Sequence, residues 1–347
     1  MTTIKDVARE AGVSIATVSR VFNDSAVVSE GTRQNVRAVA ERLNYWPNGA
    51  ARSLITNRTQ AIGVLLPDLF GEFYSEILRG MDCTARKTGL HLLVSSSHAD
   101  AKELVAALRS TRGRIDGLIV MAPDIDASAA IRATAAALPM VLIDAFSGIE
   151  GCDSVAIANQ AGAYSVVRHL VRLGHRRVAT ITGPARNADA RQRLEGYRAA
   201  LVESGADGSR ELEIAGNFTE PSGYEAVARL LALHPRPTAV FAANDYMAIG
   251  VLGALSDAGV RVPEDIALAG FDDIAMACYL NPPLTTVHVD AYRLGERAVE
   301  KLLERSHPRR GRAAQHEVLP TTLVIRSSCG SSSASQVRAS SGRPRGR

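Results

Sequence analysis

The stretch IKDVAREAGVSIATVSRVFN, residues 4–23, carries the signals of two short helices joined by a tight turn. In its first half the apolar residues recur at the spacing that places them on one helical face. They are Ile4, Val7, Ala8 and Ala11. Gly12 is expected to end this helix, because glycine readily adopts the left-handed conformation that follows a helix, and Ser14 is a good N-cap for the next one. Two helices with a glycine turn between them indicate a helix-turn-helix unit.

A third helix completes this unit. It starts near Ser29, and its apolar residues again follow the helical spacing: Val36, Val39, Ala40 and Leu43. The buried side of the second helix is formed by Val18, Val21 and Phe22. In a helix-turn-helix unit the N-terminal turn of the second helix meets the edges of the DNA bases, so the remaining residues of that turn are candidate readers of sequence.

The candidate DNA contacts differ in their chemistry. Ile15 and Ala16 offer apolar surface to a thymine methyl group, and Arg20 can bind guanine O6 and N7 together. Three polar residues suit phosphate contacts, which position a protein without reading sequence. They are Ser14, Thr17 and Asn23. Thr3 and Ser19 also belong to the expected DNA-binding set. A three-helix domain without a nucleic-acid partner is the alternative.

The length and composition are typical of a soluble globular protein. With 347 residues, of which 46% are hydrophobic and 22% charged, two or three domains are expected. The four cysteines form no CxxC pair, which argues against a zinc site and a disulfide framework and fits a reducing compartment. The sequence has neither an apolar signal-peptide core nor a run of 18 apolar residues. We therefore expect a cytoplasmic protein that does not contact a membrane.

The formal net charge of +4 is unevenly distributed. Residues 1–60 carry eight basic and five acidic side chains, and residues 305–347 carry nine arginines and one acid, which leaves about −7 on the remainder. A basic N-terminal module on an acidic body suits an anionic polymer bound at one end. The low-complexity basic tail, residues 330–347, is expected to be disordered. It either assists non-specific DNA association or is a solvated tail with no role.

The segment after the third helix predicts a short and marginal helix. Pro47 stops the third helix, and Asn48 can cap a new one. This helix is about eight residues long, which is below the length at which isolated helices are stable in water. Gly49 weakens it by up to ~1 kcal/mol relative to alanine. We therefore expect this helix to be marginal in isolation.

The segments IKDVAREAGVSIATVSRVFN and LNYWPNGAARSL (43–54) resemble the lactose-repressor (LacI/GalR) family of bacterial transcription regulators. The resemblance implies that the short segment is a hinge helix that folds on operator DNA and enters the minor groove. It also implies that Leu54, supported by Ala51, wedges into the central base step, and that Asn48 belongs to the DNA-binding set. The alternative role for Leu54 is a core leucine under the linker.

From residue 60 onward, apolar and β-branched runs alternate with helical segments. The runs are AIGVLLPD (61–68), HLLVSSS (91–97), GLIVMAPD (117–124), PMVLIDA (139–145), RRVATITG (176–183), TAVFAAND (238–245), IALAGFDD (266–273) and TTVHVDA (285–291). This βαβ alternation predicts parallel sheets covered by helices on both faces. In such sheets ligands bind at the carboxyl ends of the strands.

Acids and an amide stand where several of these runs end. They are Asp68, Asp144, Asn244, Asp245, Asp272 and Asp273. Singly, each is more simply a loop or cap residue. Together with the donor fork of Arg193 they suit a neutral polyol, since each sugar hydroxyl both donates and accepts. Candidate apolar surfaces for sugar C–H groups, or else core residues, are Phe70, Phe73, Tyr74 and Phe218.

The body, about residues 60–327, resembles the periplasmic-binding-protein-like core of the same family. The matching segments are GHRRVATITGP (174–184), PTAVFAANDYMAIG (237–250), RVPEDIALAGFDD (261–273) and NPPLTTV (281–287). The resemblance implies two lobes with an effector in the cleft between them. The implied effector contacts are Asp144, Arg193, Phe218, Asn244 and Asp272, with a loop that closes over the ligand and carries Phe70, Phe73 and Tyr74. Many family members have a glutamine after the TTV strand, whereas His288 follows here and is expected to be a surface strand residue.

The expected fold class is an N-terminal three-helix helix-turn-helix DNA-binding domain plus an α/β, two-lobed periplasmic-binding-protein-like core. The expected domains are a headpiece at 1–46, a hinge helix and linker at 47–58, an effector-binding and dimerisation core at 59–329 and the tail at 330–347. Within the core, we expect the N-lobe at about 59–158 and 290–319 and the C-lobe at about 159–287 and 320–329.

The motifs favour a regulator over an enzyme or a transport protein. No GxGxxG follows a strand, and no GxxxxGK[ST], GxSxG or HExxH occurs, so no catalysis, metal or cofactor is expected. A free solute-binding protein would lack the first sixty residues. We expect a ligand-responsive repressor of carbohydrate-utilisation genes, which binds a pseudo-palindromic operator and associates with the nucleoid when bound. It is expected to be a homodimer. No leucine heptads follow residue 303, so a coiled-coil segment that would join two dimers into a tetramer is not expected. A purine or another small metabolite is the alternative to a sugar effector.

Overall fold

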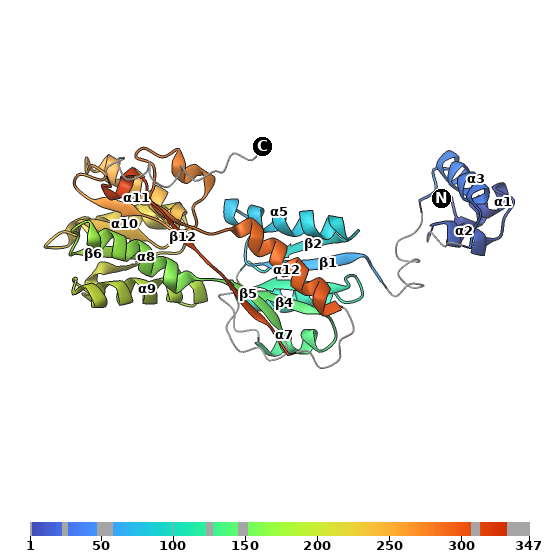
Figure 1. The fold of residues 1–347 in the computed structure, drawn as a ribbon, viewed down its shortest axis with the longest axis horizontal. Coiled ribbons are helices and arrows are strands. Elements are labelled where there is room, and N and C mark those ends of the chain that lie inside the picture. Colours follow the sequence, from blue (N-terminus) through green and yellow to red (C-terminus); the bar gives the residue numbers. More distant parts are fainter. Residues whose placement is uncertain are drawn as a thin grey trace, which may run out of the picture. The chain divides into compact units, whose positions relative to one another are not determined.

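A computed structural model describes residues 2–22, 27–46, 58–98, 100–122, 128–144, 152–306 and 313–331 (Figure 1). The chain divides into two units, Met1–Gln60 and Ala61–Arg347. Separate sets of buried apolar side chains form the cores of these units.

The described part of the N-terminal unit forms three helices, α1 (Ile4–Glu10), α2 (Ile15–Phe22) and α3 (Glu30–Arg42). The Ser14 hydroxyl caps α2 by accepting a hydrogen bond from the Thr17 amide at 3.1 Å. Gly12 has a φ of +64° and makes the turn between the first two helices. The apolar faces meet in one core, formed by Val7, Ala8, Ala11, Val18, Val21, Val36, Val39 and Ala40. The predicted helix-turn-helix unit is confirmed.

The second unit contains two parallel sheets, each with its own covering helices. The first sheet has the strand order β11-β5-β4-β3-β1-β2, and every neighbouring pair in it is parallel. Its strands are β1 (Ala61–Leu66), β2 (His91–Ser96), β3 (Gly117–Met121), β4 (Met140–Ile143), β5 (Asp153–Ile157) and β11 (His316–Leu319). This sheet and its helices are called the first lobe.

Helices cover both faces of the first sheet. Alternate strand residues such as Val64 pack on one face against α5 (Glu72–Lys87) and α12 (Ala291–Ser306). Their neighbours such as Leu65 pack on the other face against α6 (Ala101–Ser110) and α7 (Ser128–Ala135). Strands covered on both faces need apolar residues at successive positions, which explains why β1 is buried along its whole length.

The second sheet repeats this arrangement with the order β7-β6-β8-β9, again parallel throughout. Its strands are β6 (Val178–Thr182), β7 (Glu213–Ala215), β8 (Ala239–Ala242) and β9 (Ala267–Ala269). One face is covered by α8 (Asn159–Arg172) and α9 (Ala188–Ser204), and the other by α10 (Glu220–Ala232) and α11 (Asp245–Asp257). This sheet and its helices are called the second lobe. The predicted parallel sheets with helices on both faces are confirmed.

The chain passes between the lobes three times. It enters the second lobe after β5 and returns through β10 (Thr286–His288), which pairs antiparallel with β12 (Thr322–Val324). The third passage links β11 of the first sheet to β12, and Figure 1 shows this red segment running from one sheet to the other. These passages join the lobes along one side, so any change in the angle between the lobes must occur there.

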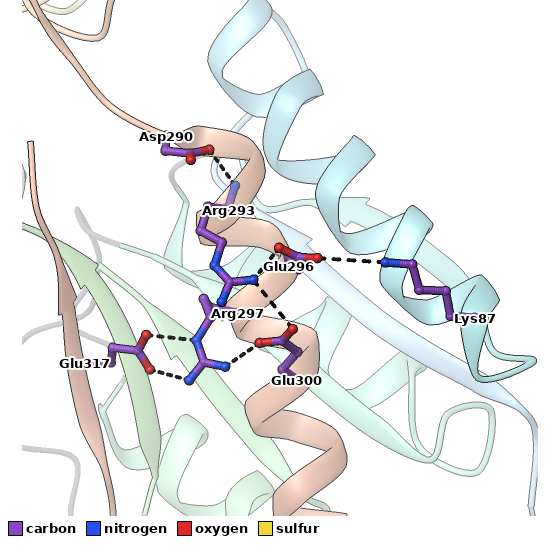
Figure 2. Close-up of polar contacts among 7 residues, drawn as sticks. All are labelled: Lys87, Asp290, Arg293, Glu296, Arg297, Glu300 and Glu317. Atoms are coloured by element: carbon purple, nitrogen blue, oxygen red, sulfur yellow. Dashed lines mark hydrogen bonds and ion pairs between the residues drawn. The ribbon is translucent and has the colours of Figure 1, made fainter. Parts of the chain in front are cut away.

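An ion-pair network holds the ends of two passages to the first lobe (Figure 2). Arg297 of α12 donates two hydrogen bonds to the Glu317 carboxylate of β11, at 2.8 and 2.6 Å. The buried Lys301 places its Nζ 3.0 Å from the same carboxylate. Glu296 faces Arg293 on its own helix and Lys87 of α5, with 3.9 Å separating Lys87 Nζ from Glu296 Oε1. The network therefore ties α12 to both β11 and α5.

Candidate ligand cleft and nucleic-acid interface

The exposed face of α2 carries the residues predicted to meet DNA bases. Ile15 is 45% exposed, and Ala16 and Arg20 are also exposed, whereas Val18 and Val21 are buried. Ile15 is not among the buried residues of the core of its unit. The helix therefore presents small, apolar and cationic groups outward while its other side holds the core, which is the arrangement of a groove-reading helix.

The predicted polar DNA contacts have partners within the unit. The Ser14 and Thr17 hydroxyls lie 2.9 Å apart, and the Thr3 hydroxyl donates to Asp6 Oδ2 at 2.7 Å in the capping box of α1. Ser19 is half-buried. Four further residues of the predicted interface lie outside the described residues. They are Asn23, Asn48, Ala51 and Leu54.

A cavity of about 400 Å³ lies between the two lobes, where the strands of both sheets end. The first lobe lines it with residues that follow β1, β2 and β3, among them the predicted Phe70, Phe73 and Tyr74. The second lobe lines it with the predicted Arg193, Phe218, Asn244 and Asp272. The structure thus gathers side chains from segments more than two hundred residues apart around one polar and aromatic cavity.

Arg193 is the most firmly positioned group of the cavity. It comes from α9 and is only 4% exposed. Its Nε donates to Asn159 Oδ1 at 2.8 Å and its Nη1 donates to the Ala243 carbonyl at 2.6 Å. Its guanidinium stacks 3.8 Å from the centroid of the Phe271 ring. Nη1 also lies 3.1 Å from Asp272 Oδ1. A planar donor fork fixed on several sides is pre-organised for recognising an oxygen-rich ligand.

Several cavity residues have backbone conformations that are unfavourable for residues other than glycine. Asp272 has a φ of +108° and Phe218 a φ of +71°. Main-chain hydrogen bonds hold Asp272 in place, from its amide to the Val287 carbonyl at 2.9 Å and from the Val289 amide to its carbonyl at 3.3 Å. The Phe218 ring fits only because Gly183 has no Cβ, since one would collide with it. Strain of this kind gathers at binding sites, where the surroundings over-determine it.

Asp144 differs from the expectation that it contacts the effector directly. Its side chain is buried and does not line the cavity. Asp144 Oδ1 accepts a hydrogen bond from the Ile157 amide at 3.1 Å, and Oδ2 has no hydrogen-bond partner among the described residues. Asp144 ends β4 as predicted, but its carboxyl group turns to the start of the passage after β5. It therefore influences the cavity through its charge.

Burial raises the pKa values of two carboxyl groups at the cleft. The pKa of Asp272 rises to about 6, because loss of hydration disfavours the charged form more than Arg193 favours it. The pKa of Asp144 rises to about 7 for the same reason, opposed by the Ile157 amide and by Arg193. Both groups therefore change charge close to neutral pH.

The sequence did not single out Asp189, which lines the cavity, or Asn159, which hydrogen-bonds to both Asp189 and Arg193. Asn159 Nδ2 donates to Asp189 Oδ1 at 3.0 Å, and both side chains are buried. Asp189 stands four residues before Arg193 on α9, the spacing that places two residues on one helical face. That spacing was the available signal for Asp189. No such signal exists for Asn159, because only the packing of α8 on α9 brings it close to Asp189 and Arg193.

Asn244 and three other polar residues near these strand ends have structural partners. Asn244 caps α11 by accepting from the Met247 amide at 3.0 Å, and it also donates to the Phe218 carbonyl at 2.9 Å. The fully buried Asp245 accepts from the Thr286 hydroxyl at 2.6 Å and from the Ile274 amide at 3.0 Å. Asp273 pairs with Arg326 at 2.8 Å and with His288 at 3.1 Å. The His288 side chain is 47% exposed and lies outside the cavity.

The described residues contain no group of three His, Cys, Asp or Glu side chains placed to hold a metal ion. None of the described helices is both long enough and apolar enough to cross a membrane.

Two family models match the chain in the order of its units. The model for bacterial regulatory proteins of the lacI family matches residues 3–48, and that for a periplasmic binding protein-like domain matches residues 167–329. The HTH-type transcriptional repressor PurR of Photobacterium profundum is 37% identical over 94% of this chain and 98% of its own length. The ribose operon repressor of Escherichia coli is 39% identical over 88% of this chain and 93% of its own length.

Solved structures agree with these matches. The lac repressor dimer bound to operator and the anti-inducer ONPF has a TM-score of 0.86 at 32% identity and covers 94% of this chain and 99% of its own. The complex of the transcriptional regulator CelR with cellobiose has a TM-score of 0.72 at 31% identity and covers 94% of this chain and 100% of its own. The chain belongs to the lacI family of bacterial regulatory proteins, and it is a ligand-responsive, DNA-binding transcriptional regulator.

Proposed function

We propose that the protein is a repressor that binds a pseudo-palindromic operator as a homodimer and that a small sugar bound in the cleft changes its affinity for that operator. The observation that carries this proposal is the buried Arg193–Asp272 pair at the floor of a cavity formed by both lobes. A ligand there touches both lobes at once. Its differential affinity for two lobe arrangements sets the largest change in DNA affinity that it can cause.

The chemistry of the cavity favours a sugar. Arg193 offers donors and Asp272 offers acceptors side by side, a combination that suits neighbouring hydroxyl groups. Phe73 and Phe218 supply apolar surface for the C–H faces of a sugar ring. Among the relatives, the ribose operon repressor is named for a sugar, and the CelR structure contains cellobiose. These observations support a carbohydrate effector and regulation of carbohydrate-utilisation genes.

A purine base is the second candidate effector. Phe70, Phe73, Tyr74 and Phe218 all line the cavity. Aromatic side chains stack well on a flat heterocycle, and the Arg193 fork can hydrogen-bond to a ring nitrogen or carbonyl oxygen.

On the DNA side, Ile15, Ala16 and Arg20 are proposed to face bases in the major groove. Leu54, supported by Ala51, is proposed to wedge into the minor groove of a central base step. With small or apolar side chains at two of its three reading positions, α2 specifies little by itself. Much of the selectivity then comes from the deformability of the central step and the spacing of the half-sites.

The proposed role needs binding equilibria and no catalytic step, so we infer that the protein is not an enzyme and uses no cofactor. It acts where the chromosome lies, in the cytoplasm and at the nucleoid while it occupies an operator. A dimer with two-fold symmetry matches an operator with two half-sites.

A thermal-shift screen of the full-length protein against monosaccharides, disaccharides and purine bases tests the effector class. A true effector present at about one hundred times its Kd stabilises the fold by about 2.7 kcal/mol. Each ligand that raises the Tm is then added to an operator-binding measurement. Stabilisation by a sugar together with a changed operator affinity supports the proposal. Stabilisation by purines alone replaces the sugar with the second candidate.

A further inference from the structure

The first residue of α5 bonds to the opposite lobe. Glu72 belongs to the first lobe, and its backbone amide donates to the Tyr246 hydroxyl of α11 at 2.8 Å. Its Oε1 accepts from the Ala275 amide, at the start of η2 (Ala275–Cys278), at 2.6 Å. Both partners belong to segments that follow strands of the second sheet. These two hydrogen bonds, called the Glu72 latch, therefore join the lobes directly.

The backbone next to Glu72 is shaped for this contact. Gly71 has a φ of +96°, and a Cβ there would lie 3.1 Å from the Tyr246 hydroxyl. The Phe70 and Tyr246 rings also meet across the lobes, with 6.4 Å between their centroids. A glycine with a positive φ lets the chain approach Tyr246 closely. The loop of the first lobe that carries Phe70 thus contacts the second lobe directly.

Glu72 lies beside the cavity, and its partner Tyr246 is one of the residues that line it. Glu72 does not line the cavity, whereas Phe70 and Phe73 on either side of it do. Ala275 stands three residues after Asp272, the proposed ligand acceptor in the opposite wall. The Glu72 carboxylate therefore joins the two walls from a position outside the cavity.

We propose that Glu72 is a positioning residue that keeps the lobes at the separation at which both walls of the cleft reach the same ligand. Hydrogen bonds are lost beyond about 3.5 Å, so an increase in the angle between the lobes breaks both bonds of the latch. The latch favours the arrangement in which a ligand can contact both lobes. The apparent affinity of a ligand is proportional to the population of that arrangement, so it decreases when that population decreases. This inference rests on the proposed ligand function of the cleft.

A simpler role for Glu72 is the stabilisation of its own helix, since an acid in the first turn interacts favourably with the helix dipole. That role affects α5 alone. With that role alone, loss of the Glu72 carboxylate changes neither the hydrogen exchange of the Ala275 amide, which lies on the other lobe, nor the ligand affinity. Measurements on the second lobe therefore distinguish a latch between the lobes from stabilisation of α5 alone.

Three single variants of the full-length protein test the latch. Glu72→Ala removes the acceptor for the Ala275 amide, and Glu72→Gln keeps a neutral acceptor in the same place. Glu76→Ala is the matched control, because Glu76 is an acid one turn later on α5 that hydrogen-bonds to Arg79 of the same helix. Amide hydrogen exchange is measured without ligand on residues 71–75 and 272–278, and D-ribose binding is measured by calorimetry.

Glu72→Ala is expected to speed exchange in residues 272–278 at least about threefold and to weaken D-ribose binding about 3- to 10-fold. Glu72→Gln is expected to recover part of both effects, and Glu76→Ala to leave both unchanged. Unchanged exchange in residues 272–278 with Glu72→Ala overturns the latch. Faster exchange with unaltered D-ribose affinity overturns its positioning role. If the wild-type protein does not bind D-ribose, that result counts against this sugar as the effector, and the exchange data alone decide whether the latch exists.

Discussion

Arg193 Nη1 lies 3.1 Å from Asp272 Oδ1, and both side chains are more than nine-tenths buried at the floor of the cleft. The two groups come from different elements, since Arg193 lies on α9 and Asp272 on the loop after β9. A buried pair of this kind contributes little net stability, but removing one partner leaves the other charged and buried. Folding therefore depends on the same two residues that are proposed to bind the effector.

Asp272→Ala is expected to weaken binding of the cognate effector at least about tenfold, because it removes the acceptor next to the Arg193 fork. Asp272→Asn keeps one acceptor oxygen and is expected to lose less affinity. Calorimetry with the effector found by thermal-shift screening measures both. Full retention of affinity in Asp272→Ala would reject the assignment of this residue to the effector site.

Arg193→Ala is expected to lower the free energy of unfolding by about 3–5 kcal/mol, because it leaves Asp272 as an unpaired buried carboxyl group. It also removes the stacking on Phe271 and the hydrogen bond to Asn159. Urea unfolding followed by circular dichroism measures the change. Arg79→Ala provides the control, since Arg79 is well exposed and its loss is expected to cost at most about 1 kcal/mol. Equal effects of the two substitutions would contradict this account of the cleft.

The stability of the second unit is expected to depend on pH through Asp144. Burial raises its pKa from 3.8 to about 7, so the folded state holds this proton more tightly than the unfolded chain between those values. The stabilisation is complete below the unfolded pKa and is lost as pH rises through about 7. Asp144→Asn has no charge to bury. Relative to the wild type, this variant is expected to become more stable as the pH is raised from about 5 to about 8.

Urea unfolding of both proteins at the two pH values checks the prediction for Asp144. The prediction is contradicted if the free energies of unfolding of the wild type and Asp144→Asn differ by the same amount at both pH values. The pKa of Asp272 is also raised, to about 6, so its contribution to stability is likewise lost as the pH rises. Relative to the wild type, Asp272→Asn is therefore also expected to become more stable with rising pH, and this gain is complete at a lower pH than for Asp144→Asn.

Glu317→Ala is expected to destabilise the first lobe by about 3–5 kcal/mol, because Lys301 would remain charged while only 3% exposed. The same substitution removes the two hydrogen bonds from Arg297 that tie α12 to β11 (Figure 2). The Tm measured by calorimetry reports the loss. Glu300→Ala removes a carboxylate that pairs with Arg293 and Arg297 of its own helix, leaves the Lys301–Glu317 pair intact, and is expected to cost much less. A Tm for Glu317→Ala equal to that of Glu300→Ala would show that the network does not support the fold.

The DNA interface predicts different effects for Arg20 and Leu54. Arg20→Ala is expected to cost about 1–3 kcal/mol of binding and to relax specificity at one base pair of each half-site. Leu54→Ala is expected to reduce both operator affinity and DNA bending, because it removes the apolar wedge. Footprinting and a bending assay on the same operator separate the two effects. Unaltered affinity and bending with Leu54→Ala would remove the wedge role.

The sequence predicted most of the central strands, because their apolar patterns reflect burial, but it missed β5, which lies inside the first sheet and begins with the polar residues Asp153 and Ser154. The caps at Ser14 and Ser29 and the turn at Gly12 follow from local chemistry alone. The short strand β7, three residues at the edge of its sheet, carries no such pattern. β11 and β12 were missed for a similar reason, since their half-exposed residues contribute little to either core.

The site was harder to predict in detail. Strand-end positions correctly suggested Asp272 and Asn244 as cavity residues, since parallel strands end at a common edge. The same rule placed Asp144 in the ligand site, but it cannot tell which way a carboxyl group turns after its strand. Asn159 and the Glu72 latch depend on helix packing and on contact between the lobes. Such contacts join residues far apart in the sequence and leave no local pattern.

Occupation of the cleft is proposed to control DNA binding. The most direct measurement is the affinity of the full-length protein for an operator selected from random duplexes, titrated by fluorescence anisotropy with and without the effector found by screening. Sequence-specific binding is expected, with a Kd that changes at least about fivefold with effector. Asp272→Asn, which keeps the shape of the side chain, is expected to weaken this change while keeping the DNA affinity measured without effector. Specific DNA binding that no cleft ligand alters, or an undiminished effector response in Asp272→Asn, would contradict this role of the cleft.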